Sequence, residues 1–214
     1  MNAEHGDQIR DVAIVGGGAA GLSAALTLAR ARRSAIVIDG GHPRNAPAAA
    51  AHGLIGLEGI NPLELLETAR NEARSYGAEI VQTAIADASG SRGSGFVLQL
   101  DDGSAVRARQ VLIATGVRDE MPAVLGLAER WGRDVVHCPY CHGWEIRDTR
   151  IGLLVTGPMS AMQAMLFHQW SGKMSFFSNG HEFPADQLGK LSALGIEIVP
   201  GAVSAVEVVD DRLA

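Results

Sequence analysis

The chain has 214 residues, which is enough for one large domain or two small ones. Its 18 basic and 24 acidic residues give a net charge of −6, which excludes a nucleic-acid binder that works through a basic surface. Hydrophobic residues make up 47% of the chain, enough for a buried core, and two cysteines are too few for a secreted disulfide scaffold.

Strands and helices alternate in the first half of the chain, which predicts a parallel sheet. In chain order we expect strand 12–15, helix 20–33, strand 35–39, helix 61–77, strand 79–85, and a hairpin of strands 96–100 and 104–116 that adds an antiparallel layer. Asn61, Pro62 and Gly77 are typical N-cap, first-turn and stop residues of the second helix.

An uncharged stretch, residues 12–29, is just long enough for a membrane span. The cluster of glycines within it favours a strand, a turn and a helix instead. The first residues are acidic and polar, unlike a secretory signal, so we expect a cytoplasmic protein with no membrane segment.

Aromatic residues are concentrated late in the chain, since only Tyr76 and Phe96 precede residue 131. This shift, together with the glycines and proline of residues 116–126, predicts a boundary between domains 1–117 and 118–214. The second half again alternates strands and helices: strand 151–155, helix 158–170, strand 174–178, helix 184–195 and strand 196–200.

The first motif is G-x-G-x-x-G, formed by Gly16, Gly18 and Gly21 between a strand and a helix. Asp39 ends the next strand, where an acid can bind a ribose hydroxyl. The glycines permit a tight turn and a close approach of the backbone to a pyrophosphate. We therefore predict dinucleotide binding, with a glycine-rich turn that holds no ligand as the alternative.

The second motif, VLIATG at Val111–Gly116, resembles the second cofactor-contacting segment of flavoproteins with two dinucleotide-binding domains. That resemblance implies that the first unit binds FAD rather than NAD. The residues assigned to cofactor binding are Gly16, Gly17, Gly18, Ala19, Ala20, Gly21, Asp39, Asn45, Ala114, Thr115 and Gly116.

The third motif is HCPYCHGWE, which contains Cys138 and Cys141 as C-x-x-C. Two thiols at this spacing can close a small disulfide ring, and thiols at the start of a helix are readily ionised. The alternatives are c-type haem attachment, a zinc site that adds His137 and His142, and two ordinary buried cysteines. We favour a redox pair, with no metal.

Together the three motifs resemble thioredoxin reductase of the low-molecular-weight type. The resemblance implies an α/β fold with two Rossmann-like dinucleotide-binding units. It implies that Cys141 lies against the flavin and that Cys138 attacks the disulfide of a partner. His142 stands where the family usually has an acid/base Asp, and the C-H-G-aromatic-E form is more similar to a dithiol-oxidase branch. His142 is therefore an acid/base candidate, with a surface or packing histidine as the alternative.

The chain departs from this family in its second half. The expected second glycine motif is replaced by the residues from Val155 to Ala161, which include Gly157 and Pro158, and no arginine lies in Ser178–His181. NADPH binding is therefore weakly supported. The chain is also expected to lack the C-terminal return to the first domain.

The sequence predicts an FAD-dependent dithiol/disulfide oxidoreductase that acts on a thioredoxin-like protein or a small dithiol, as a homodimer. The alternatives are a dithiol oxidase that passes electrons to oxygen and a non-catalytic remnant of a flavoprotein.

Overall fold

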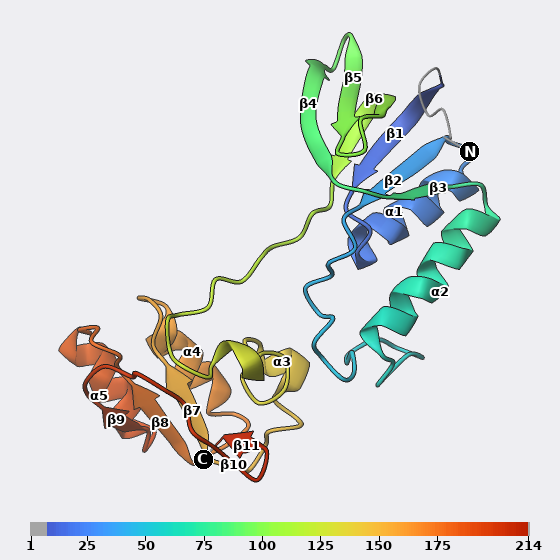
Figure 1. The fold of residues 1–214 in the computed structure, drawn as a ribbon. Coiled ribbons are helices and arrows are strands. Elements are labelled where there is room, and N and C mark those ends of the chain that lie inside the picture. Colours follow the sequence, from blue (N-terminus) through green and yellow to red (C-terminus); the bar gives the residue numbers. More distant parts are fainter. Residues whose placement is uncertain (1–7, 214) are drawn as a thin grey trace. The chain divides into compact units, whose positions relative to one another are not determined.

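The computed structural model of the protein describes residues 8–213, whose contacts divide them into two compact units. Unit 1 consists of residues 8–46 and 60–118, and unit 2 of residues 47–59 and 119–213. The loop 47–59 groups with unit 2 although it lies early in the sequence, so the units are not two uninterrupted stretches of chain. Each unit has its own sheet (Figure 1).

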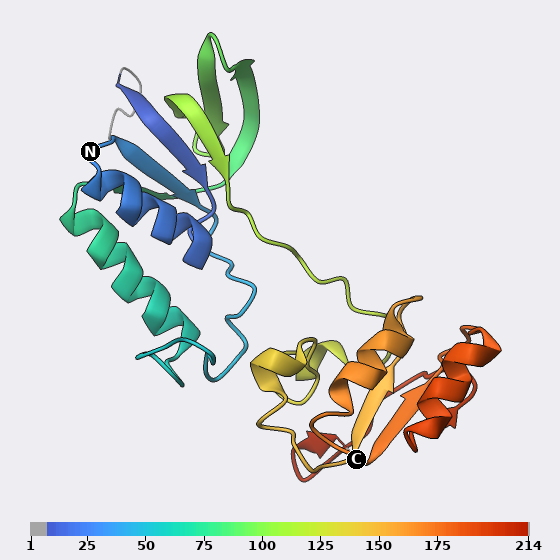
Figure 2. The same ribbon diagram turned by 180° about the vertical axis from the view of Figure 1, so that it is seen from behind.

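Unit 1 is built on one six-stranded sheet with the strand order β3-β2-β1-β6-β5-β4. Neighbours among β1, β2, β3 and β6 pair in parallel, whereas β4–β5 and β5–β6 are antiparallel pairs. The strands are β1 (Ile9–Val15), β2 (Ala35–Asp39), β3 (Glu79–Gln82), β4 (Ile85–Ser91), β5 (Gly95–Leu100) and β6 (Ala105–Ile113). Helices α1 (Ala19–Arg30) and α2 (Pro62–Ser75) pack together on one face of the parallel strands (Figure 2).

Strands β1 and β2 carry apolar runs, Val12–Val15 and Ala35–Ile38, because side chains on both of their faces pack into the core. Ile14 and Val37 pack with the helices, in a cluster that includes Ala25 of α1 and Ala73 of α2. On the other face, neighbouring strand residues such as Ile36 pack with side chains of β5 and β6. The antiparallel strands thus cover the second face of the sheet and are also hydrogen-bonded into it through β6.

The predicted ends of helix α2 are confirmed. The Asn61 side chain accepts hydrogen bonds from the amides of Leu63 and Glu64, at 2.9 and 3.3 Å, and Pro62 opens the helix. Gly77 follows the helix with a φ of +92°, a conformation that glycine adopts without strain.

One strand prediction was wrong, because residues 79–85 do not form a single strand. The chain changes partner at Thr83, so that β3 pairs in parallel with β2 while β4 pairs antiparallel with β5. The Thr83 amide donates to the carbonyl of Asp39 at the point of change. The polar second half of β4 lacks an apolar pattern, which is why periodicity did not reveal it.

Unit 2 contains a three-stranded parallel sheet with the order β7-β8-β9. Its strands are β7 (Ile151–Leu154), β8 (Met174–Phe177) and β9 (Glu197–Val199), and its longer helices are α4 (Ser160–Phe167) and α5 (Ala185–Ala193). Phe176, Val155 and Leu191 are fully buried at the centre of its core. The expected helix 158–170 is shorter at both ends, because turns precede Ser160 and follow Phe167.

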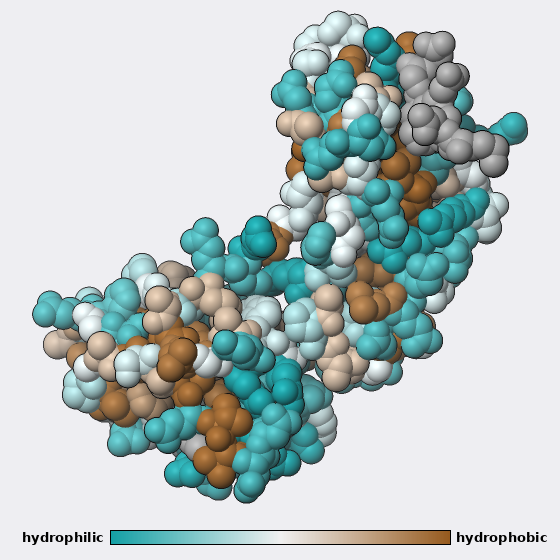
Figure 3. Space-filling view, viewed as in Figure 1, coloured by the Kyte–Doolittle hydropathy of each residue, from teal (hydrophilic) through white to brown (hydrophobic). Residues whose placement is uncertain are grey.

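Two short features complete unit 2. A single helical turn, α3 (Pro139–His142), precedes the sheet, and a small hairpin of β10 (Val208–Val209) and β11 (Arg212–Leu213) follows it. Hydrophobic residues are interspersed among hydrophilic ones on the surface of each unit (Figure 3). No helix in residues 8–213 is both long and apolar enough to span a bilayer.

Candidate functional site

Three glycines at the junction of β1 and α1 are closely packed, two in the loop and Gly21 in the first turn of α1. Gly16 has a φ of +108°, and a Cβ there would collide with the carbonyl oxygen of Ala114. A Cβ on Gly21 would collide with the carbonyl oxygen of Gly16, and one on Gly17 with the carboxylate of Asp39. These three positions need glycine for the turn itself to form.

Gly18 is different, because a Cβ there would meet no atom within 4 Å. Gly18 is the N-cap of α1, and no side chain caps the helix. Ala19 and Ala20, the first helical residues, are exposed. The amides of a first helical turn have no partner within the helix, so this end of α1 leaves room and donors for an anion.

The Ala114–Gly116 segment lies against the glycine loop. Strands β1 and β6 pair in parallel with Val15 opposite Ile113, and the amide of Ala114 donates to the carbonyl of Val15 at 2.8 Å. A Cβ on Gly16 would lie 3.1 Å from the Cα of Thr115. The fold therefore brings the two predicted cofactor motifs together at the carboxyl ends of adjacent strands.

Asp39, at the end of β2, is buried and hydrogen-bonded. Its Oδ1 accepts from the amide of Gly41, and its Oδ2 accepts from Arg70 Nη2, both at 3.1 Å. The carboxylate keeps acceptor capacity, because two carboxylate oxygens offer about four lone-pair positions. The buried Nε of Arg70 has no hydrogen-bond partner among the described residues.

Asn45, also predicted to contact the cofactor, is exposed in a turn in which the amide of Ala46 donates to the carbonyl of Pro43 at 3.0 Å. None of the hydrogen bonds of the described chain joins it to the glycine loop. The other residues fit the adenosine diphosphate half of a dinucleotide: a helix end with open space at Gly18, and a buried carboxylate beside it for a ribose hydroxyl.

Cys138 and Cys141 lie on the single helical turn of unit 2. Cys138 is the N-cap of α3, and its carbonyl accepts hydrogen bonds from the amides of Cys141 and His142, both at 3.2 Å. Cys138 is half-buried and Cys141 is exposed. Residues three apart on a helical turn lie on the same side of it, so the turn suits a thiol pair.

Aromatic packing holds this turn in place. The Tyr140 ring meets the Trp170 ring edge-on at 5.5 Å, and a Cβ on Gly143 would lie 2.7 Å from the Trp170 indole. Trp144 is stacked under the guanidinium of Arg147 at 3.8 Å. Tyr140 and Trp144 remain largely exposed, so apolar surface borders the two cysteines.

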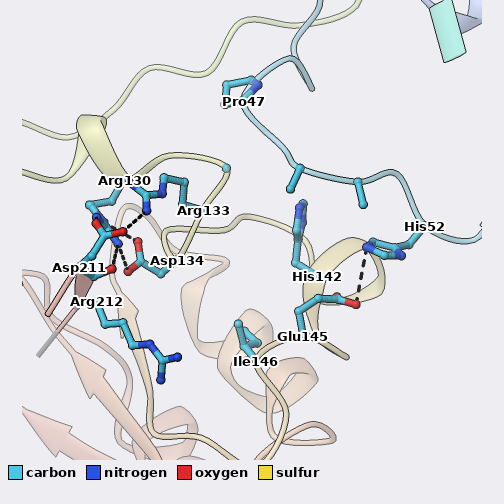
Figure 4. A pocket seen from close by; sticks show the side chains of 13 residues that line it. Pro47, His52, Arg130, Arg133, Asp134, His142, Glu145, Ile146, Asp211 and Arg212 are labelled. Atoms are coloured by element: carbon cyan, nitrogen blue, oxygen red, sulfur yellow. Dashed lines mark hydrogen bonds and ion pairs between the residues drawn. The ribbon is translucent and has the colours of Figure 1, made fainter. Parts of the chain in front are cut away.

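His142 lines a cavity of about 390 Å³ within unit 2, between the loop 47–52 and the chain end at Asp211 and Arg212 (Figure 4). Burial lowers the pKa of His142 below its usual value of 6.5, the carboxylate of Glu145 opposes this, and His52 adds to it. The neutral imidazole, the form that accepts a proton, is therefore favoured.

The opposite wall of this cavity is a closed ionic cluster. Arg130 Nε donates to Asp134 and Nη1 donates to Asp211, both at 2.7 Å, and Arg133 donates to Asp211 at 2.5 Å. These hydrogen bonds lower the pKa of both carboxyl groups and raise that of Arg130. The cluster ties the β10–β11 hairpin to the turn at Arg130.

In the turn between β7 and α4, nearby side chains form hydrogen bonds with backbone groups. The amide of Thr156 donates to the Ser160 hydroxyl at 3.3 Å. Asn179 Nδ2 donates to the carbonyl of Val155 at 3.3 Å, and its Oδ1 accepts from the amide of Val203 at 3.0 Å. Side chains therefore bond to the amide of Thr156 and the carbonyl of Val155, at the turn where the family resemblance implies a second dinucleotide-binding site.

Three residues were not predicted from the sequence: Arg70, which binds Asp39, and His52 and Glu145 at the cavity. Glu145 is part of the quoted motif, three residues after His142, so spacing could have indicated it. Arg70 and His52 carry no local signal, because their partners are distant in sequence. Within residues 8–213 no group of three or more His, Cys, Asp or Glu side chains is arranged to hold a metal.

Comparison with known proteins now gives the class. Residues 10–171 match the pyridine nucleotide-disulphide oxidoreductase family, and the chain belongs to this family. Its relatives place it among the members that are thioredoxin reductase-like.

Two curated relatives are named thioredoxin reductases. The chain is 38% identical to tcpT of Claviceps purpurea over 87% of its length, and 35% identical to sirT of Leptosphaeria maculans over 92%. It spans 60% and 65% of those proteins. The crystal structure of HlmI matches 97% of the chain with a TM-score of 0.92 and 43% identity, and the match covers 66% of that chain. The α/β fold with Rossmann-like parallel sheets is confirmed.

Proposed function

We propose that the protein exchanges electrons between FAD and a substrate thiol or disulfide through Cys138 and Cys141. The observation that carries the proposal is the contact between the glycine loop and the Ala114–Gly116 segment in unit 1, in a chain whose unit 2 presents a C-x-x-C turn. Gly18, the first turn of α1 and Asp39 would hold the adenosine diphosphate half of FAD. When bound, FAD would accept or supply the electron pair of the dithiol.

The thiol chemistry balances without another reactant. In the oxidising direction a substrate thiolate attacks one sulfur of the Cys138–Cys141 disulfide, so that a substrate–enzyme S–S bond forms as the enzyme disulfide breaks. The second substrate thiolate then displaces the enzyme sulfur. The substrate loses two electrons and two protons, and the enzyme pair becomes a dithiol. His142 would accept a proton from the attacking thiol.

We propose a thioredoxin-like protein or a small dithiol as the partner, and a homodimer as the assembly. The names of the relatives support a thioredoxin-type partner, and the exposed Tyr140 and Trp144 offer an apolar surface beside the thiols for either one. The count of two cysteines agrees with a reducing, cytoplasmic setting.

A dithiol oxidase that uses oxygen is the second candidate. The turn after β7 favours it, because the Ser160 hydroxyl already accepts the amide of Thr156 and Pro158 has no amide to donate to NADPH.

The test uses the full-length, flavin-loaded protein under anaerobic conditions. A dithiol is expected to bleach the flavin absorbance of the wild type and to leave that of Cys138→Ser and Cys141→Ser unchanged. The two variants distinguish the roles: Cys138→Ser should show a long-wavelength band from the Cys141 thiolate beside the flavin, and Cys141→Ser should not. Bleaching of both variants at the wild-type rate would contradict the proposal, and the reverse band pattern would exchange the two roles.

A further inference from the structure

The loop 47–59 forms one wall of the cavity beside His142. Pro47 and Ala48 pack against Gly132 so closely that a Cβ on this glycine would lie 2.8 Å from Pro47. The amide of Gly59 donates to the carbonyl of Ala51 at 3.0 Å, which closes the far end of the loop. The loop therefore has a defined course, and His52 lies within it.

His52 lies between two carboxylates. Its Nδ1 is 2.7 Å from Glu58 Oε1 in the same loop, and its Nε2 is 3.6 Å from Glu145 Oε1 (Figure 4). The amide of Gly53 donates to the other oxygen of Glu58 at 2.8 Å. These contacts lower the pKa of Glu58, so it is ionised and fixes the direction in which the His52 ring points. The His52 ring thus lies within 4 Å of a carboxylate of its own loop and of one in the C-x-x-C segment.

Glu145 acts in turn on His142. The two residues follow the same turn of chain, three positions apart, and both line the cavity. The carboxylate of Glu145 raises the pKa of His142, against the effect of burial. Without a nearby negative charge, a half-buried imidazole becomes a weak base and accepts the proton of a thiol poorly.

We propose that Glu145 is a positioning residue that preserves the basicity of His142, and that His52 holds the Glu145 carboxylate where it does so. This inference rests on the proposed dithiol chemistry for its functional meaning. His142 takes the proton that the substrate thiol loses as its sulfur attacks, and the charge of Glu145 stabilises the imidazolium that results. The proton transfer itself changes no oxidation state; the electron pair passes from the substrate to the Cys138–Cys141 disulfide as the S–S bonds exchange.

Among the charged groups around the cavity, Glu145 is the one whose negative charge raises the pKa of His142. Arg130, Arg133, Asp134 and Asp211 are paired with one another. Arg212 from the β10–β11 hairpin also lines the cavity, and the interaction with His52 lowers the pKa of His142. Glu145 is thus the carboxylate whose removal should most weaken His142 as a base.

The test measures the titration of His142 by NMR in full-length protein with labelled histidine, with His142→Gln used to assign the signal. Glu145→Gln is expected to lower the pKa of His142, and Glu145→Asp, which keeps the charge, to restore part of it. Glu182→Gln removes an exposed carboxylate elsewhere in unit 2 and should change nothing. An unchanged titration in Glu145→Gln would overturn the proposal.

His52 is tested by a double-mutant cycle. If His52 acts only through its own charge, His52→Gln raises the pKa of His142 equally with and without Glu145. If His52 also holds Glu145, then His52→Gln raises the pKa of His142 less in the wild type than in Glu145→Gln, or lowers it, because the wild type also loses the position of the Glu145 carboxylate. Equal rises in both backgrounds would remove His52 from the proposal.

The kinetic readout separates this inference from the proposed function. In Glu145→Gln the kcat for dithiol oxidation should fall roughly threefold to tenfold, with KM unchanged and the pH profile shifted in the direction of the NMR titration. A titration that shifts while the pH profile does not would overturn the catalytic meaning. A wild type that oxidises no dithiol would refute the proposed function, while the NMR cycle would still decide the positioning.

Discussion

The strand-to-helix turn of unit 1 and that of unit 2 solve the same problem in different ways. After β1, three closely packed glycines form the turn, and Gly18 leaves open space at an uncapped helix end. After β7, Val155 is fully buried and the Ser160 hydroxyl accepts the amide of Thr156. No side chain bonds to the backbone amides at the start of α1, whereas in the second turn the Ser160 hydroxyl takes one amide.

The same strand-to-helix topology is therefore built from two different kinds of turn. Neither helix has a side-chain cap, so what differs is the turn itself: close-packed glycines after β1, and after β7 the larger Val155 and Thr156, with the Thr156 amide already bonded to Ser160. The two turns therefore predict different responses to mutation and to ligands.

The largest expected effect concerns Gly21 and Gly157. Gly21→Ala should lower the free energy of unfolding of unit 1 by about 2 kcal/mol or more, because the collision with Gly16 outweighs the gain of about 1 kcal/mol in helix propensity. Gly157→Ala meets no atom within 4 Å and should stay within about 0.5 kcal/mol of the wild type. Urea unfolding followed by circular dichroism measures both, and equal losses would contradict the comparison.

The next effect concerns flavin. Gly18→Leu places a side chain in the open space before α1, so the affinity for FAD should fall at least about thirtyfold, which is about 2 kcal/mol. The stability of the flavin-free protein should change by less than about 1 kcal/mol, since the side chain meets no protein atom. Flavin titration by absorbance checks this, and full flavin occupancy in the variant would refute the assignment of the loop.

A third effect concerns NADPH, the ligand that the turn after β7 would bind. NADPH should reduce the flavin of the full-length protein poorly, because Pro158 removes an amide donor and Ser178–His181 lacks an arginine for the 2′-phosphate. Loss of such an arginine contact weakens binding by about 2 kcal/mol, roughly thirtyfold. Stopped-flow absorbance decides, and fast bleaching by micromolar NADPH would show that Gly157 and its neighbours suffice.

The smallest effect is a pH dependence of stability in unit 2. The pKa of His142 is lowered in the folded chain, so as pH falls through 6.5 the unfolded chain takes up a proton before the folded chain does. The free energy of unfolding should therefore decrease as the pH is lowered from 6.5 to the pKa of His142 in the folded chain. Above pH 6.5, His142 should contribute no pH dependence to the free energy of unfolding. His142→Gln should flatten the dependence in urea titrations at several pH values, and an unchanged slope would mean that another group causes it.

Local sequence patterns determined much of this molecule. The glycine spacing, the caps of α2 and the apolar runs of β1, β2 and β8 predicted the parallel units, because turn geometry and burial act on neighbouring residues. The helical turn at Pro139–His142 was not among the predicted elements, because a single turn is too short to show a helical period. The change of strand partner at Thr83 was missed, because pairing is chosen between strands and leaves no period in the sequence.

Only the tertiary structure decided which distant residues meet. The chain folds Ala114 against Gly16, Arg70 against Asp39, and His52 against Glu145. Loop 47–59 groups with unit 2, although the boundary predicted from composition, between residues 117 and 118, assigned it to the first domain. The sequence alone determined the local turns and the spacing of the two cysteines, because those depend on adjacent backbone. The surroundings of Asp39 and His142 depend on long-range packing, which no local pattern records.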